Sequence, residues 1–112
     1  MYPAENRLRK TREIEKLFKT GKSFLTAIFY LKLAKNNLKQ TRFAVVVGTK
    51  IHKRAVKRNL VKRRIRASLV ELMPRLKPGF DVIISARTGI IDKTFPQIKQ
   101  ELTSAFQKAG LF

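Results

Sequence analysis

Hydrophobic residues recur with a helical period in three segments of the chain, residues 11–19, 53–76 and 95–109. In each segment the apolar positions are three or four residues apart, so they share one face of a helix. The first helix is expected to begin with Thr11 as its N-cap. The expected stops of the three helices are Gly21, Gly79 and Gly110.

A period of two marks the strands. Residues 24–34 alternate between an apolar face and a face of aromatic, hydroxyl and cationic groups, which predicts one long strand with its apolar face on the core. Residues 42–48 are apolar on both faces, so a central strand buried on both sides is expected there. Residues 80–86 have the same character and are expected to form the last strand.

The order helix, strands, helix, strand, helix predicts an α+β sandwich, in which three helices pack on a small mixed β-sheet. The second helix lies in the crossover of a βαβ unit. No repeat or low-complexity linker interrupts the sequence, so a single domain is expected over residues 1–112. Residues 1–10 are polar enough to form a loose arm.

Charge points to the class of partner. The chain has 26 Lys and Arg against seven Asp and Glu, a net charge of +19, yet 44% hydrophobic residues and eight Phe indicate that it folds. A compact domain of this charge is stabilised by a polyanion, and nucleic acid is favoured over an anionic membrane surface. No cysteine, signal peptide or membrane-spanning stretch is present in the sequence, so a cytoplasmic protein is expected.

The strongest candidate site is the basic run from 50 to 66, which has nine Lys or Arg and no acid. On a helix, Asn59, Lys62, Arg63 and Arg66 share one face that suits a row of phosphates. Arg58 falls nearer the apolar stripe. A merely solvated face is less favoured, because such faces mix both signs of charge. The expected RNA-binding residues are Lys50, Lys53, Arg54, Lys57, Arg58, Asn59, Lys62, Arg63 and Arg66.

A second candidate surface combines the mixed face of the first strand with the exposed side of the first helix. Aromatic and cationic side chains in a groove stack unpaired bases and follow their backbone. Taken singly, each aromatic residue is more often part of the core. The residues of this predicted groove are Ile14, Phe18, Tyr30, Lys32 and Arg87.

The sequence gives no catalytic or metal-binding constellation of its own. A histidine-pair ribonuclease needs two imidazoles, and this chain has only His52. The seven acids are scattered, without the spacing of a two-metal site, and there is no zinc-ligand pattern or glycine-rich phosphate loop. No catalytic residue and no metal ligand are therefore expected in the protein.

The segment Lys-Arg-Ala-Val-Lys-Arg-Asn-Leu-Val-Lys-Arg-Arg-Ile-Arg, residues 53–66, resembles the signature basic helix of the bacterial ribonuclease P protein. The resemblance extends to residues 6–8, 17–21 and 81–89, so it covers nearly the whole chain. Leu60 departs from it, because it stands where the family's Arg-Asn-Arg triplet has its second Arg. Ile14 stands where many members have an aromatic residue.

The resemblance implies an α+β fold like the second domain of a small-subunit ribosomal protein, with a left-handed crossover around the basic helix. It also implies that this helix docks on a catalytic RNA, one protein per RNA, and that the groove holds the 5′ leader of precursor tRNA. Magnesium ions bound mainly by the RNA would then activate the hydrolytic water. The alternatives left open are a ribosomal or nucleoid-type binding protein without a catalytic role and a self-sufficient protein nuclease.

Overall fold

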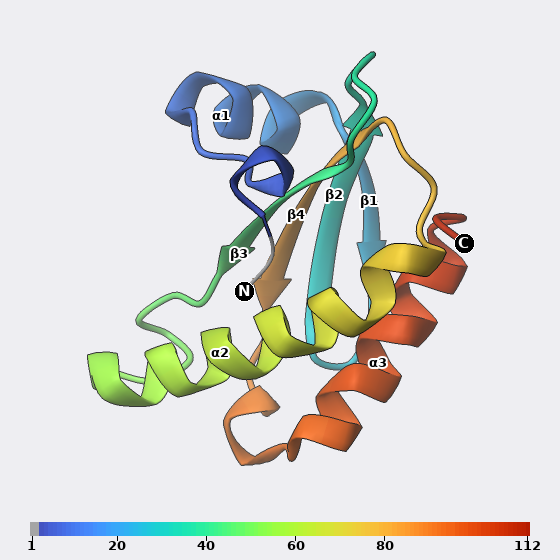
Figure 1. Ribbon diagram of the computed structural model, residues 1–112. Coiled ribbons are helices and arrows are strands. Elements are labelled where there is room, and N and C mark those ends of the chain that lie inside the picture. Colours follow the sequence, from blue (N-terminus) through green and yellow to red (C-terminus); the bar gives the residue numbers. More distant parts are fainter. Residues whose placement is uncertain (1–2) are drawn as a thin grey trace.

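The computed structural model describes residues 3–112 as one four-stranded sheet with α1 on one face and α2 and α3 on the other (Figure 1). The α+β architecture predicted from the sequence is confirmed. In chain order the elements are η1 Ala4–Asn6, α1 Thr11–Thr20, β1 Lys22–Leu25, β2 Phe29–Lys35, β3 Arg42–Val46, α2 Ala55–Leu72, η2 Met73–Arg75, β4 Phe80–Ala86, η3 Ile90–Asp92 and α3 Phe95–Lys108. No described helix meets the length and apolarity needed to cross a membrane.

The sheet is mixed, with the strand order β1-β2-β4-β3. Neighbouring strands run antiparallel except β3 and β4, which are parallel and are joined through α2. The prediction of a central strand at 42–48 was wrong, because β3 lies at an edge of the sheet. The centre is occupied by β4, where Val82, Ile83 and Ile84 are fully buried.

The outer edge of β3 is covered by the N-terminal segment. Both faces of β3 are apolar because Phe43 packs in the apolar cluster on one side of the sheet and Ala44 in the cluster on the other. The backbone N–H of Leu8 donates to the carbonyl of Phe43 at 2.8 Å, and the Asn6 side chain donates to the carbonyl of Thr41 at 2.9 Å. Leu8 itself is only 4% exposed. Residues 6–8, which were expected to belong to a loose arm, are therefore docked on the sheet and protect its edge.

The single long strand expected at 24–34 is a hairpin instead, with β1 and β2 on either side of a turn. The backbone N–H of Thr26 donates to the carbonyl of Phe29 at 2.8 Å, and the Thr26 hydroxyl accepts from the Phe29 N–H at 3.1 Å. A threonine side chain thus supplies the turn without glycine, proline or asparagine. The apolar alternation continues across the turn, which conceals it in the sequence.

Two apolar clusters fix the layers. The larger fills the space between the sheet and the helix pair α2–α3, with Leu31, Ile65 and Phe106 among its fully buried members. The smaller lies under α1, where Leu17 packs on Ile83. Because α1 provides one buried residue and covers little of its face, part of that sheet face remains open.

The helix ends were predicted in part. α1 ends at Gly21, as expected. Glycine is needed at this position because a Cβ atom there would lie 2.8 Å from the carbonyl oxygen of Leu17. The N-cap was wrong: Thr11 is the first helical residue, after Lys10. A capping box that the sequence analysis had not identified starts α3, where the hydroxyl of Thr94 and the side chain of Gln97 exchange hydrogen bonds with each other's backbone N–H.

Candidate nucleic-acid interface

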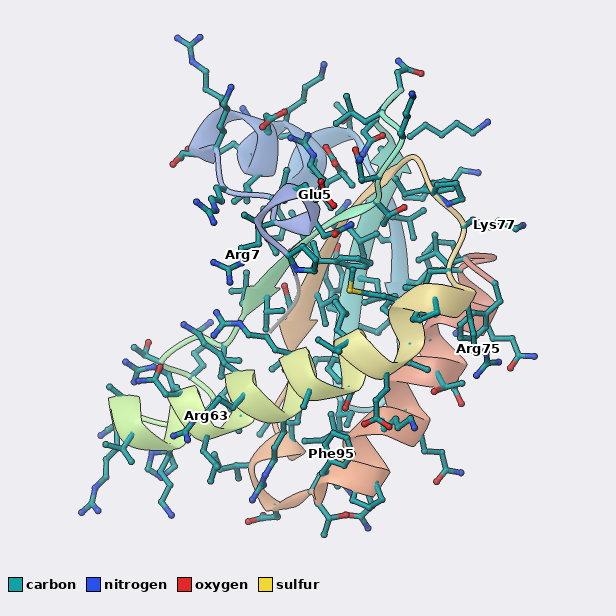
Figure 2. All side chains as sticks on the ribbon, viewed as in Figure 1. Glu5, Arg7, Arg63, Arg75, Lys77 and Phe95 are labelled. Atoms are coloured by element: carbon teal, nitrogen blue, oxygen red, sulfur yellow. The ribbon has the colours of Figure 1, made fainter. Side chains whose placement is uncertain are left out.

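The basic face of α2 has the geometry expected from its spacing. On one side of the helix Val61, Ile65 and Leu69 are fully buried against the sheet and α3. Away from that side, Asn59 and Arg63 are exposed, and Figure 2 shows Arg63 in the half of α2 nearest its N-terminus. Lys62 and Arg66 flank them and are half-buried. Within residues 3–112 none of these four side chains has a hydrogen-bond or ion-pair partner, so all are available to a ligand.

The remaining predicted cations lie where the chain enters α2. Lys50 and Lys53 are exposed on the loop after β3, Arg54 is the residue before the first turn, and Lys57 is exposed within that turn. The sequence analysis missed Val56, which is largely exposed among these cations. The N-terminus of a helix carries partial positive charge, so this end of α2 adds its dipole to the side-chain charges.

Two arginines of the basic run are tied into the fold. Nη1 of Arg58 donates to the carbonyl oxygens of His52 and Lys53 at 2.9 and 2.7 Å, which fixes the entrance to the helix. The side chain of His52 also takes part in this local structure, since its Nδ1 accepts a hydrogen bond from the backbone N–H of Arg54 at 3.0 Å. Arg64 turns toward α3 and donates to the carbonyl of Lys93 at 2.9 Å. The basic run therefore divides into structural and free cations.

The open part of the sheet lies on the face that α1 covers only in part. The register places Lys32 beside Ile83 and Tyr30 beside Ser85, so Tyr30 and Lys32 share this face two residues apart. Both are half-buried. Leu25 pairs with Tyr30 in the register and is 52% exposed, although it belongs to the apolar face of residues 24–34 that was expected to meet the core.

Hydrogen bonds orient the two polar side chains of this face. The Tyr30 hydroxyl lies 3.1 Å from the hydroxyl of Ser23, and Nζ of Lys32 donates to the carbonyl of Gly21 at 3.2 Å. The bond with Ser23 lowers the pKa of the Tyr30 phenol, and the positive charge of Lys32 acts in the same direction. The ring of Tyr30 is thereby held in place beside a cation.

The other predicted groove residues lie around this face. Phe18 on α1 is 40% exposed, whereas Ile14 is half-buried and packs on the cluster under α1. Arg87 follows β4 and donates to the carbonyl of Thr26 in the hairpin turn. The structure thus places Tyr30 and Lys32 on one face, with α1 beside them and Arg87 at one end.

Several of the carboxylates bind cationic side chains of the protein. Within the described part of the chain, no three His, Cys, Asp or Glu side chains are grouped so that they could hold a metal ion. Glu13 and Asp81 both bind the guanidinium of Arg42, and Glu71 pairs with Lys99.

Comparison with known proteins places the chain in one family. A model of the ribonuclease P family matches residues 2–110. The ribonuclease P protein component of Synechococcus elongatus is 34% identical over 114 residues, which cover 97% of this chain and 93% of that protein. That of Clostridium botulinum is 34% identical over 109 residues, which cover 96% of this chain and 97% of the other.

Solved structures agree as well. The Staphylococcus aureus ribonuclease P protein superposes with a TM-score of 0.87 at 27% identity, covering 96% of this chain and 97% of that one. The Thermotoga maritima protein gives 0.83 at 26% identity, covering 91% and 96%. A match that spans nearly the whole chain in family, sequence and structure confirms the resemblance read from the basic helix, and this chain belongs to the ribonuclease P protein family as the protein subunit of ribonuclease P.

Proposed function

We propose that the protein assembles with the catalytic RNA of ribonuclease P through the basic face of α2. The observation that carries the proposal is a set of side chains on that face that have no partner within residues 3–112, namely Asn59, Lys62, Arg63 and Arg66. Three cations and an amide at this spacing match a row of phosphates and sugar hydroxyls, the groups by which A-form RNA is bound. Lys50, Lys53, Arg54 and Lys57 extend the contact at the start of the helix, with one protein per RNA.

The open sheet face binds the 5′ leader of precursor tRNA. An aromatic ring and an ammonium group two residues apart suit an unpaired nucleotide, whose base stacks while its phosphate meets the cation. Phe18 and Ile14 on α1 border this leader groove, and Arg87 lies at its end. Two separate surfaces let one small protein hold both RNAs at once.

The active site is carried by the RNA, and the protein assists. Magnesium ions bound mainly by the RNA activate the water that removes the leader and leaves the mature 5′ end of the tRNA. The protein assists cleavage in the cytoplasm by binding RNA. It brings cations close to both RNAs and raises the affinity of the holoenzyme for leader-bearing substrate.

The test is reconstitution with the cognate catalytic RNA. Adding the protein should increase cleavage of precursor tRNA most strongly at low magnesium concentration, and the holoenzyme should bind precursor more tightly than mature tRNA. If a matched RNA gains nothing from the protein, the proposal fails.

The protein must also be assayed alone. One solved relative, from Staphylococcus aureus, is described as a mutant with defective mRNA degradation activity. Cleavage of RNA by this chain after removal of all copurifying RNA would contradict an active site carried by the RNA partner. RNA that copurifies from the native cell should contain the catalytic RNA.

A further inference from the structure

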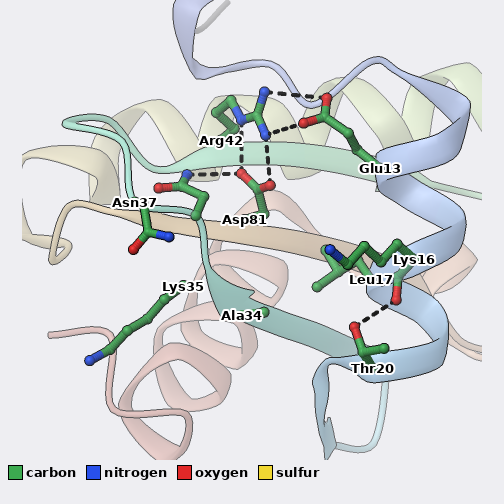
Figure 3. A pocket seen from close by; sticks show the side chains of 10 residues that line it. Glu13, Lys16, Leu17, Thr20, Ala34, Lys35, Asn37, Arg42 and Asp81 are labelled. Carbon is green, nitrogen blue, oxygen red and sulfur yellow. Dashed lines mark hydrogen bonds and ion pairs between the residues drawn. The ribbon is translucent and has the colours of Figure 1, made fainter.

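One arginine joins the first helix to two strands. Nη2 of Arg42, on β3, lies 2.9 Å from Oε2 of Glu13 on α1, and its Nη1 lies 3.4 Å from Oε1 (Figure 3). The same guanidinium binds Asp81 on β4, from Nε to Oδ1 at 2.8 Å and from Nη2 to Oδ2 at 2.7 Å. These three residues form a clamp between α1 and the sheet.

The clamp is sheltered and charged. The side chains of Arg42 and Asp81 are 18% and 15% exposed, and that of Glu13 is 36% exposed. The hydrogen bonds that Arg42 donates to Asp81 and, to a smaller extent, to Glu13 raise its pKa above the ordinary value, although partial burial acts against the charged form. Asn36 holds Asp81 from another side, through a 2.9 Å bond to Oδ1. Asp81 thus anchors Arg42, and Arg42 holds the helix.

The contact that α1 itself makes with the sheet is small. Leu17 is the one side chain of this helix that is buried, and Ile14 packs only partly beneath it. So small an apolar contact leaves the tilt of the helix on the sheet sensitive to a polar bond made elsewhere along it. Glu13 lies one turn before Leu17 and supplies that bond.

The clamp and the groove lie on different sides of α1. Glu13, Lys16 and Thr20 line a pocket of about 280 Å³ beside the turn after β2. Phe18 does not line it, because five residues after Glu13 the helix has turned its side chain to another side. Because α1 moves as one rigid body, losing the bond at Glu13 is expected to shift Phe18 relative to the sheet that carries Tyr30.

We propose that Arg42, acting through Glu13, positions α1 as the wall of the leader groove and so sets the preference for leader-bearing RNA. The inference rests on the proposed function of the open sheet face. Arg42 is a positioning residue that touches no substrate. Its effect reaches the RNA only through the placement of Phe18 and Ile14.

The experiment uses Glu13→Gln and Glu13→Asp in the reconstituted holoenzyme. Glu13→Gln keeps the length of the side chain but removes its charge, and Glu13→Asp keeps the charge but shortens the reach. In both variants Arg42 keeps Asp81, so the sheet stays intact. Glu15→Gln is the matched control, because exposed Glu15 lies on the same helix and has no bonding partner among the described residues.

Both Glu13 variants should lose roughly three- to fivefold in the ratio of precursor to mature tRNA affinity relative to Glu15→Gln, the size expected for one partly exposed ion pair. The loss should appear in KM and not in kcat, with unchanged binding of the catalytic RNA. Faster amide hydrogen exchange in α1 should accompany it. A general loss of structure would not separate precursor from mature tRNA in this way.

Failure of the leader groove and failure of the positioning role give different results. If the wild-type holoenzyme shows no preference for precursor, the proposed leader groove fails, and the role of Arg42 fails with it. If the wild type shows the preference and Glu13→Gln equals Glu15→Gln, only the positioning role is overturned. Equal losses for precursor and mature tRNA would overturn it as well.

Discussion

Arg58 binds the backbone that leads into its own helix, since its Nη1 donates to the carbonyl oxygen of His52 at 2.9 Å. A second bond from the same nitrogen reaches the carbonyl of Lys53. Arg58 lies beside the apolar stripe of α2, and these two bonds explain why it is not one of the cations that remain available to RNA. It also separates two kinds of arginine that look alike in the basic run.

Replacing Arg58 and Arg63 by alanine should therefore give different results. Arg63→Ala removes a free cation, so RNA affinity falls, the slope of log Kd against log salt decreases by about one, and stability is unchanged. Arg58→Ala removes two hydrogen bonds to carbonyl groups and should also lower the free energy of unfolding by about 1–2 kcal/mol. Denaturant unfolding and binding at several salt concentrations measure both. Identical unfolding curves for the two variants would contradict the structural role of Arg58.

The leader groove predicts a selective effect at Tyr30. Tyr30→Ala removes the ring on the open face, so affinity for precursor tRNA should fall by the equivalent of about 1–3 kcal/mol, the worth of one stacked base. Affinity for mature tRNA should stay the same, because it has no leader. Tyr30→Phe is the control, since it keeps the ring and loses only the bond to Ser23. Equal losses for both RNAs would argue against a leader site on this face.

The hydroxyl pair on the same face predicts a shifted titration. The bond with Ser23 lowers the pKa of the Tyr30 phenol because it stabilises the phenolate, and Lys32 adds to the effect. In a Tyr2→Phe background, absorbance should report a midpoint for Tyr30 below that of an ordinary tyrosine. Ser23→Ala should move the midpoint upward, since the strongest cause is lost. No movement would show that the bond does not form in solution.

The docked N-terminal segment predicts a stability effect at Leu8. This side chain is buried under α1, and its backbone covers the edge of β3. Leu8→Ala should lower the free energy of unfolding by about 2–4 kcal/mol, the range for a buried leucine. Arg9→Ala, at the exposed next position, should change it little. A loss below about 0.5 kcal/mol for Leu8→Ala would mean that the segment is loose, as its polar sequence suggests.

The parts of the fold that depend on local pattern could be predicted from the sequence. The bounds of β4, the buried stripe of α2 and the stop at Gly21 each follow from periodicity or from one glycine. The angular position of Arg58 near the stripe was also correct. These features depend on residues close together in the chain, so the spacing of apolar residues along the sequence predicts them.

Most of the failures are contacts between distant residues. The edge position of β3 follows from its pairing with β4 alone among the strands, and β4 lies far along the chain. The exposure of Leu25 has a local cause, a turn made by Thr26 inside a continuous apolar alternation. The clamp brings residues 13, 42 and 81 together, and no local period signals that meeting. The binding partner of Arg64, the carbonyl of Lys93, is hidden for the same reason, because spacing shows on which side of a helix a residue lies but not which distant residue it meets there.

Leu60 offers a test in which binding should improve. It stands where the family's triplet has its second arginine, and it is half-buried on α2, one residue after Asn59. Leu60→Arg adds a cation to a helix that already presents phosphate-binding side chains, so one further phosphate contact is expected. Affinity for the catalytic RNA should rise about three- to tenfold at low salt, and the salt slope should become steeper by about one.

Gln107→Arg adds the same charge on the exposed surface of α3 and controls for net charge alone. If both variants raise affinity equally, the gain comes from overall charge and α2 is not the docking helix. If only Leu60→Arg does so, and its effect disappears at high salt, the new arginine contacts RNA from the face of α2 to which binding is assigned.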